Sequence, residues 1–436
     1  MIHRPTDAVL GRIAAAVIAF ASLAYWANLS HGELAALSYD SFRYLGGAES
    51  MIARSAYLDL DGTPQHTWPP GTSLVYAALS RLSGRAADAL VPAVNLIALL
   101  VALFAFWRML EAARVRWWIA ATAFGALALN GVFLSEMTKL WSDPIALALF
   151  VTLLCCLMTE SFVAANVIAV VAIVFRFAML ATLPVLLAAA LLSRRRRWMP
   201  FVSGGAMLLF VLATRGGRGV MQPLQLRANW NAFAELAAQM VPPVLVVIAV
   251  TMVIPLLVAP RSRGVVLAMT WIVSYMSFLI IAQALAKPSF TTDLRILFPL
   301  YPAMLLSAAA AAESVRSRAA AIALTVVIGI GALRGAHYVA GSLRARPAEQ
   351  HCMTREALVA QIRKAAGTAP SVATNAQGLV WYALRRPTYR LGHSTAPPNV
   401  LILWIDPATA CPSSVDDVDV PRQGIVIAAD GSRGPA

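Results

Sequence analysis

Long apolar stretches separated by short polar segments dominate the chain between residues 13 and 340. Most are about 15–22 residues long, the length at which an α-helix crosses about 30 Å of hydrocarbon. We therefore predict an all-α polytopic membrane protein with about 11 transmembrane helices, within a range of roughly 10–13. The apolar blocks are 13–29, 69–82, 89–107, 117–134, 142–158, 162–175, 177–192, 199–213, 240–259, 264–286, 297–312 and 319–340.

One of these blocks and the polar loop before it differ from the rest. Block 69–82 is short and opens with Pro69-Pro70-Gly71, so we expect a short or half-inserted helix there. In the loop before it, 31–68, apolar residues recur at helical spacing with charges between them over Ser41–Tyr57. This pattern predicts an amphipathic helix that lies on the membrane surface.

The composition changes at about Ser342, where the long apolar stretches end. Three short β-like runs follow, at Leu379–Tyr382, Val400–Ile405 and Ile425–Ala428. We therefore predict a transmembrane domain over 1–341, which includes loop 31–68, and a small α/β domain over 342–436.

Composition excludes an ordinary soluble enzyme. Of the 436 residues, 59% are hydrophobic and 13% charged, and mean hydropathy is +0.70. A soluble domain has about 25% charged residues. The net charge of +14 could suit nucleic acid, but the arginines gather at the ends of the apolar blocks. This distribution follows the positive-inside rule of membrane proteins, so we expect no nucleic-acid partner.

The same charge bias predicts the topology. The arginine clusters have few acidic neighbours, which places their connections in the cytoplasm together with the N-terminus. Loop 31–68 and the C-terminal domain then lie in the periplasm, and we expect a multi-pass protein of a bacterial inner membrane. The clusters are Arg4 with Arg12, Arg108 with Arg114 and Arg116, Arg194–Arg197, Arg261 with Arg263, and Arg316 with Arg318.

A few ionisable residues lie at the opposite ends of the expected helices. Charge beside hydrocarbon is costly, so these residues are candidates for function, although each can also be a plain anchor at the membrane interface. Asp40 additionally suits a helix N-cap. The candidates are Asp40, Glu136, Lys139, Arg176, Asp293 and Arg295.

A carboxylate and arginines at one membrane surface suit one kind of chemistry. A guanidinium donates paired hydrogen bonds to phosphate oxygens, and a carboxylate can accept the proton of an attacking hydroxyl. A lipid-anchored phosphate would present its head group at this depth. The set therefore indicates transfer of a group from a lipid phosphate to a hydroxyl.

The order of several short motifs resembles a known family, the C-superfamily (GT-C) membrane glycosyltransferases, which include the protein O-mannosyltransferase and aminoarabinose-transferase relatives. The first-loop motifs are similar to the first periplasmic loop of that family, and the later ones follow in the family's order. They are Tyr39-Asp40-Ser-Phe-Arg-Tyr44, Ala53-Arg-Ser-Ala-Tyr57, Trp68-Pro69-Pro70-Gly71, Ser135-Glu136, Phe175-Arg176-Phe177, Asp293-Leu-Arg295, and Ala373-Thr374-Asn375-Ala376 with Tyr382, Arg386 and Pro387.

The resemblance implies a glycosyltransferase that moves a sugar from a polyprenyl-phosphate donor to a hydroxyl of a periplasmic or lipid acceptor. In that family pattern, Asp40 is the catalytic base or orients the acceptor, and Arg176 and Arg295 bind the donor phosphate. The sequence requires no cofactor. Some relatives use a divalent metal, and no metal-ligand spacing supports one here. Site-shaping candidates are Glu136, Lys139, Asp293, Tyr44 and His66.

Several alternatives stay open on the sequence. Cys352 and Cys411 could form a disulfide in an oxidising periplasm, or could be unrelated thiols. A transporter or lipid flippase would show inverted repeats, which we do not find. A non-catalytic membrane scaffold would leave Asp40, Arg176 and Arg295 scattered in space.

Overall fold

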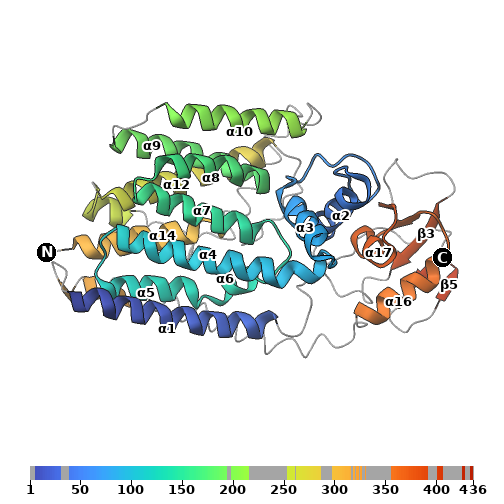
Figure 1. The fold of residues 1–436 in the computed structure, drawn as a ribbon, viewed down its shortest axis with the longest axis horizontal. Helices are drawn as coiled ribbons and strands as arrows, with labels where there is room; N and C mark the ends of the chain where they lie inside the picture. Colours follow the sequence, from blue (N-terminus) through green and yellow to red (C-terminus); the bar gives the residue numbers. More distant parts are fainter. Residues whose placement is uncertain are drawn as a thin grey trace. The chain divides into compact units, whose positions relative to one another are not determined.

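The computed structural model describes most of the chain as helices, followed near the C-terminus by a small sheet (Figure 1). The described residues are 5–30, 39–193, 198–215, 253–260, 262–285, 297–315, 318–319, 321–323, 325–326, 329, 355–390, 400–405, 425–427 and 433–435.

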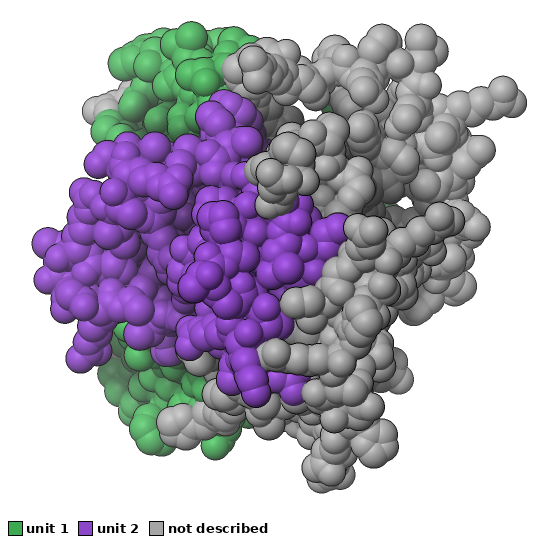
Figure 2. Space-filling model, turned by 90° about the vertical axis from the view of Figure 1, so that its right-hand side faces the viewer, with its two compact units in different colours: residues 1–32, 93–138, 142–339 green, residues 33–92, 139–141, 340–436 purple. Residues whose placement is uncertain are grey.

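The chain forms two compact units, which Figure 2 colours separately. The first contains Met1–Gly32, Ala93–Thr138 and Ser142–Val339, and the second contains Glu33–Pro92, Lys139–Trp141 and Ala340–Ala436. The first loop therefore packs with the C-terminal part. The predicted end of the transmembrane domain at residue 341 stays a prediction.

The first unit is built from long helices that run side by side (Figure 1). Helix α7 packs against α8, α12 against both α9 and α14, and α1 against α5. The elements are α1 (Pro5–Ser30), most of α4 (Val91–Ala112), α5 (Trp117–Ala128), α6 (Gly131–Glu136), α7 (Asp143–Met158), α8 (Phe162–Phe175), the 3-10 helix η2 (Phe177–Thr182), α9 (Leu183–Ser193), α10 (Met199–Arg215), α12 (Arg263–Leu285) and α14 (Leu300–Ser314).

This unit makes the protein a polytopic helical membrane protein. Among the described residues, three helical segments are long and apolar enough to cross a bilayer: Asp7–Ser30, Asp88–Ala112 and Arg263–Ala282. Five further apolar helices are shorter than 18 residues. The total of about 11 spans stays a prediction.

Aromatic side chains fill the centre of the bundle. The rings of Phe150 in α7 and Trp271 in α12 stack with their centroids 3.9 Å apart, and Tyr275 lies beside Trp271 at 4.9 Å. The indole N–H of Trp271 donates to the carbonyl of Pro299 at 3.0 Å. A buried indole N–H needs such a partner, and this bond ties α12 to the start of α14.

Ion pairs join helix ends that the charge bias assigned to the cytoplasm. Arg12 near the start of α1 lies 3.6 Å from Glu111 near the end of α4. These two helices therefore run in opposite directions, with no further span needed between them. Arg116 pairs with Glu313 at 3.0 Å, and Arg263 pairs with Glu160.

The short block at 69–82 fits this arrangement. It forms α3 (Gly71–Ser83), whose 13 residues are about 20 Å long and too short to span a bilayer. The prediction of a short helix is confirmed. The left-handed residue Gly84 (φ 68°) ends the helix, as a residue without a Cβ does most easily.

The second unit combines the first loop with a five-stranded sheet. The strand order is β2-β1-β3-β4-β5, and all neighbours are parallel except β4 and β5. Its elements are α2 (Tyr39–Arg54), α3, the 3-10 helix η1 (Asp88–Leu90), α16 (Arg355–Ala366), β1 (Val372–Thr374), α17 (Gln377–Leu384), β2 (Thr388–Arg390), β3 (Leu401–Ile405), β4 (Ile425–Ile427) and β5 (Arg433–Pro435).

The amphipathic helix expected in the first loop exists as α2, with Phe42 and Leu45 buried where α2 packs on α3 and α17, and its place on the membrane surface stays a prediction. One local expectation was wrong. The run Leu379–Tyr382 lies in α17 and is not a strand, because the parallel pair β1–β2 requires a crossover, usually a helix. The strands expected near 400–405 and 425–428 are present as β3 and β4.

Gly47→Ala tests the close contact between α2 and α3. A Cβ at Gly47 would lie 2.4 Å from a ring carbon of Tyr57 and 2.7 Å from the hydroxyl of Ser73. We expect a loss of about 1–3 kcal/mol in unfolding free energy, because overpacking forces neighbours apart. Thermal unfolding of the detergent-purified protein measures this.

Gly205→Ala in α10 is the control, since nothing lies within 4 Å of its Cβ position. It should leave stability unchanged or raise it by up to about 1 kcal/mol. Equal unfolding temperatures for Gly47→Ala and wild type would contradict the packing described here.

Candidate functional site

Asp40 lies in the first turn of α2 and is half-buried. A carboxylate is stabilised there by the positive end of the helix dipole. The next part of this helix is deeply packed, since residues 41–48 are all buried. The position of Asp40 is therefore set by how α2 is held.

A buried ion pair holds α2 one turn after Asp40. Arg43 pairs with Asp59 of the first loop, and its guanidinium lies 4.6 Å above the ring of Trp68. Asp59 starts a turn in which the N–H of Gly62 donates to its carbonyl at 2.9 Å, and Gly62 has φ 85°. The Arg43–Asp59 pair was not among the predictions from the sequence.

Tyr44 and His66 have different surroundings. Tyr44 is only 4% exposed, and its carbonyl accepts a hydrogen bond of 2.9 Å from the hydroxyl of Ser73 in α3. His66 lies exposed in the loop. Tyr44 therefore packs the interior of the second unit, and the site-shaping role of both residues stays a prediction.

In the first unit, Arg176 sits where one helix ends and another begins. Its backbone is extended (φ −154°, ψ 121°) between α8 and η2, so the helical path is broken at this residue. Its side chain is mostly buried and pairs with Asp143, the first residue of α7. Tyr275 of α12 also has a side-chain hydrogen bond with Arg176.

Asp143 and Tyr275 are members of this cluster that we did not select from the sequence. Asp143 opens α7 directly before Pro144, so its sequence resembles an ordinary helix start. A guanidinium inside an apolar bundle is unstable without an opposite charge. The isolated Arg176 between apolar stretches therefore indicated that an acidic partner lies nearby in the fold.

Glu136 and Lys139 follow each other closely but belong to different units. Glu136 ends α6 and is 8% exposed. The ammonium of Lys139 lies 4.4 Å from the ring centroid of Trp141, a cation–π contact within the short segment after α6. Both stay candidates for site shaping.

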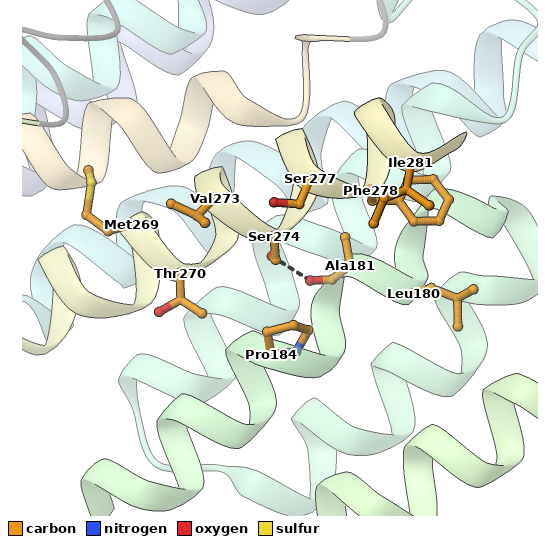
Figure 3. Close-up of a pocket in the computed structure, with 10 residues that line it drawn as sticks. All are labelled: Leu180, Ala181, Pro184, Met269, Thr270, Val273, Ser274, Ser277, Phe278 and Ile281. Carbon is orange, nitrogen blue, oxygen red and sulfur yellow. Dashed lines mark hydrogen bonds between the residues drawn. The ribbon is translucent and has the colours of Figure 1, made fainter. Parts of the chain in front are cut away.

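An apolar groove of about 620 Å³ lies along η2, α9 and α12 in the first unit (Figure 3). Arg176 directly precedes η2 and Tyr275 lies on α12, but neither residue lines the groove. The hydroxyl of Ser274 is bonded to the carbonyl of Ala181 at 2.8 Å, so it offers little polarity to an occupant. The lining residues are Leu180, Ala181, Pro184, Met269, Thr270, Val273, Ser274, Ser277, Phe278 and Ile281.

Several predicted residues lie outside the described part of the chain: Asp293, Arg295, Cys352 and Cys411. Their phosphate-binding, site-shaping and disulfide roles stay predictions. Asp40 and Arg176 belong to different units, so their convergence also stays a prediction. Within the described residues, no group of three or more His, Cys, Asp or Glu side chains could hold a metal ion.

No protein-family model and no curated protein matches the sequence. Among solved structures, the fold is similar to ArnT from Cupriavidus metallidurans in two crystal structures. The apo form matches with a TM-score of 0.50 and 15% identity over 89% of this chain and 86% of ArnT. The form bound to undecaprenyl phosphate matches with a TM-score of 0.50 and 16% identity over 91% and 85%.

The chain therefore has the fold of ArnT. The resemblance predicted from the sequence is confirmed at the level of the fold. Because identity is low, the chemistry has to be argued from this chain's own residues.

Asp143→Asn tests the buried pair. It removes the counter-charge of Arg176. We expect the free energy of unfolding to fall by about 3–5 kcal/mol, because an uncompensated charge stays buried. The double variant Asp143→Asn/Arg176→Gln should recover much of this loss. Thermal unfolding in one detergent measures both.

The matched control is Glu160→Gln, which breaks the pair with Arg263 at the other helix ends. Because the Glu160 side chain is 49% exposed, its loss should stay below about 1 kcal/mol. Similar losses in Asp143→Asn and Glu160→Gln would contradict a buried, mutually dependent Arg176–Asp143 pair.

Proposed function

We propose that the chain is a glycosyltransferase that moves a sugar from a polyprenyl-phosphate donor to an acceptor hydroxyl at the outer face of a bacterial inner membrane. The observation that carries this proposal is the mostly buried Arg176, which pairs with Asp143 at the break between α8 and η2. An apolar groove lies along η2, α9 and α12 in the same bundle, although Arg176 is not among its lining residues. A cation and an apolar groove within one helical bundle suit an anionic head group with a hydrocarbon tail.

The donor would bind through both features. The guanidinium of Arg176 would donate to phosphate oxygens, and the isoprenoid chain would lie along η2, α9 and α12. The similarity to ArnT bound to undecaprenyl phosphate supports this class of donor. Arg295 would contribute a second guanidinium, as the motif order suggests.

The acceptor would be activated by Asp40. Its carboxylate would accept the hydroxyl proton as the oxygen attacks the anomeric carbon, and the phosphate would leave with the electron pair of the broken bond. Asp40 is half-buried at the start of α2 and the eight residues after it are buried, which supports a role in which its carboxylate meets a ligand.

Asp40→Asn tests the assigned base. The amide keeps the shape but cannot accept the proton, so we expect sugar transfer to fall by about 10²–10⁴ with membrane insertion unchanged. The assay is transfer of radiolabelled sugar from a membrane lipid fraction.

Asp61→Asn is the control in the same loop, where the Asp61 carboxylate accepts bonds from the N–H and hydroxyl of Thr63 at 2.9 and 2.7 Å. It should retain turnover. Wild-type turnover in Asp40→Asn would remove the role given to Asp40.

Mass spectrometry of cell-envelope lipids and glycans, with and without the gene, identifies the substrates. The proposal predicts the loss of one single-sugar modification, accompanied by accumulation of its polyprenyl-phosphate donor. A lipid that changes its leaflet without losing a sugar would instead indicate a flippase.

A further inference from the structure

We propose that α17 is a clamp that positions α2, the helix carrying Asp40, and that Arg385 is the positioning residue of this clamp. The inference rests on the proposed function and gives the C-terminal part a role in the reaction. It depends on contacts that all lie within the second unit.

The two helices approach closely at glycines. A Cβ on Gly378 of α17 would lie 2.2 Å from a ring carbon of Phe42 in α2. A Cβ on Gly46 of α2 would lie 2.6 Å from Leu60 and 3.3 Å from the ring of Trp381. The missing side chains let aromatic rings of each helix pack on the backbone of the other, so small shifts of α17 are transmitted to α2.

Ion pairs and a hydrogen bond complete the contact at the end of α17. Arg385 follows the helix in a left-handed conformation (φ 55°), with its N–H bonded to the carbonyl of Trp381 at 2.7 Å. From there its guanidinium pairs with Glu49 of α2 and lies 3.5 Å from Asp88 of η1. The hydroxyl of Tyr382 donates to Asp88 at 3.0 Å.

Arg385 compensates two carboxylates that would otherwise repel each other. Burial raises the pKa of Glu49 above its ordinary value, Arg385 lowers it, and Asp88 raises it again. Without Arg385, the half-buried Glu49 would face Asp88 with no cation to balance them. The ion pair that joins the end of α17 to α2 would also be lost.

The clamp acts on the face of α2 opposite Asp40. Phe42, Gly46 and Glu49 are spaced four and three residues apart and share one face of the helix, whereas Asp40 lies about half a turn around. The other face is held by α3 and by the Arg43–Asp59 pair. Asp40 thus projects from a helix that is fixed on both sides.

Hydrogen bonds connect the segment before α17 to the sheet. Asn375, which follows β1, donates to the carbonyl of Ile405 at 2.7 Å and accepts from its N–H at 2.8 Å. Strand β2 also reaches the first loop directly, because the N–H of Thr388 donates to the carbonyl of Leu60 at 3.0 Å. Leu60 adjoins Asp59, the partner of Arg43.

The test compares Arg385→Ala, Arg385→Lys and the control Lys364→Ala in the full-length protein. Lys364 is exposed on α16 and carries the same charge. In Arg385→Ala, we expect amide hydrogen exchange to speed up in α2 but not in β1 or β3. We also expect kcat to fall about 10- to 100-fold with the donor KM within about twofold, as misplacement of a catalytic group does.

Arg385→Lys should recover part of both effects, and Lys364→Ala should behave as wild type. Unchanged exchange in α2, or faster exchange across β1 and β3 as well, would overturn the clamp. Faster exchange in α2 with unchanged kcat would also overturn it. If wild type transfers no sugar yet α2 loosens as expected, the clamp stands and the glycosyltransferase proposal fails.

Discussion

An arginine inside an apolar helical bundle is tolerated only with a compensating charge, and the pair of Arg176 with Asp143 meets this constraint. The pair joins α7 to the break between α8 and η2. Tyr275 adds α12 to the same point. Four helical elements are thus organised around one buried charge, and two of them, η2 and α12, also line an apolar groove.

The second unit holds the short helix α2, whose first turn carries the carboxylate of Asp40. Isolated helices of 16 residues are marginal in water. Here the apolar face of α2 is buried between α3 and α17, and its charges are matched by Asp59 and Arg385. The sheet therefore stabilises a loop that lies some 300 residues earlier in the chain.

Much of this architecture could be predicted from the sequence. Apolar length and arginine placement gave the helical bundle, and they explain why Arg12 meets Glu111 and Arg116 meets Glu313. The short apolar run in α17 was mistaken for a strand, because runs of this length do not distinguish a buried helix from a strand.

The partners of the candidate site were harder to predict. Asp143 resembles a helix start, and Arg385 resembles a surface charge, until folding brings distant segments together. Their roles depend on contacts across 33 and 336 residues, which local patterns do not encode. The gap between apolar blocks 162–175 and 177–192 nevertheless placed Arg176 correctly at a break between helices.

The role of Arg176 in binding the donor phosphate is tested most directly by measuring, with native mass spectrometry, how strongly the purified protein binds a polyprenyl phosphate. The account predicts that wild type and the control Arg263→Gln bind the lipid phosphate. Arg176→Gln, and the double variant Asp143→Asn/Arg176→Gln in which both charges are removed, should bind it at least about tenfold more weakly. The reason is that a charged hydrogen bond contributes about 1.5–3 kcal/mol. The matching polyprenol, without phosphate, should bind all four weakly. Wild-type affinity for the lipid phosphate in both Arg176 variants would contradict the account.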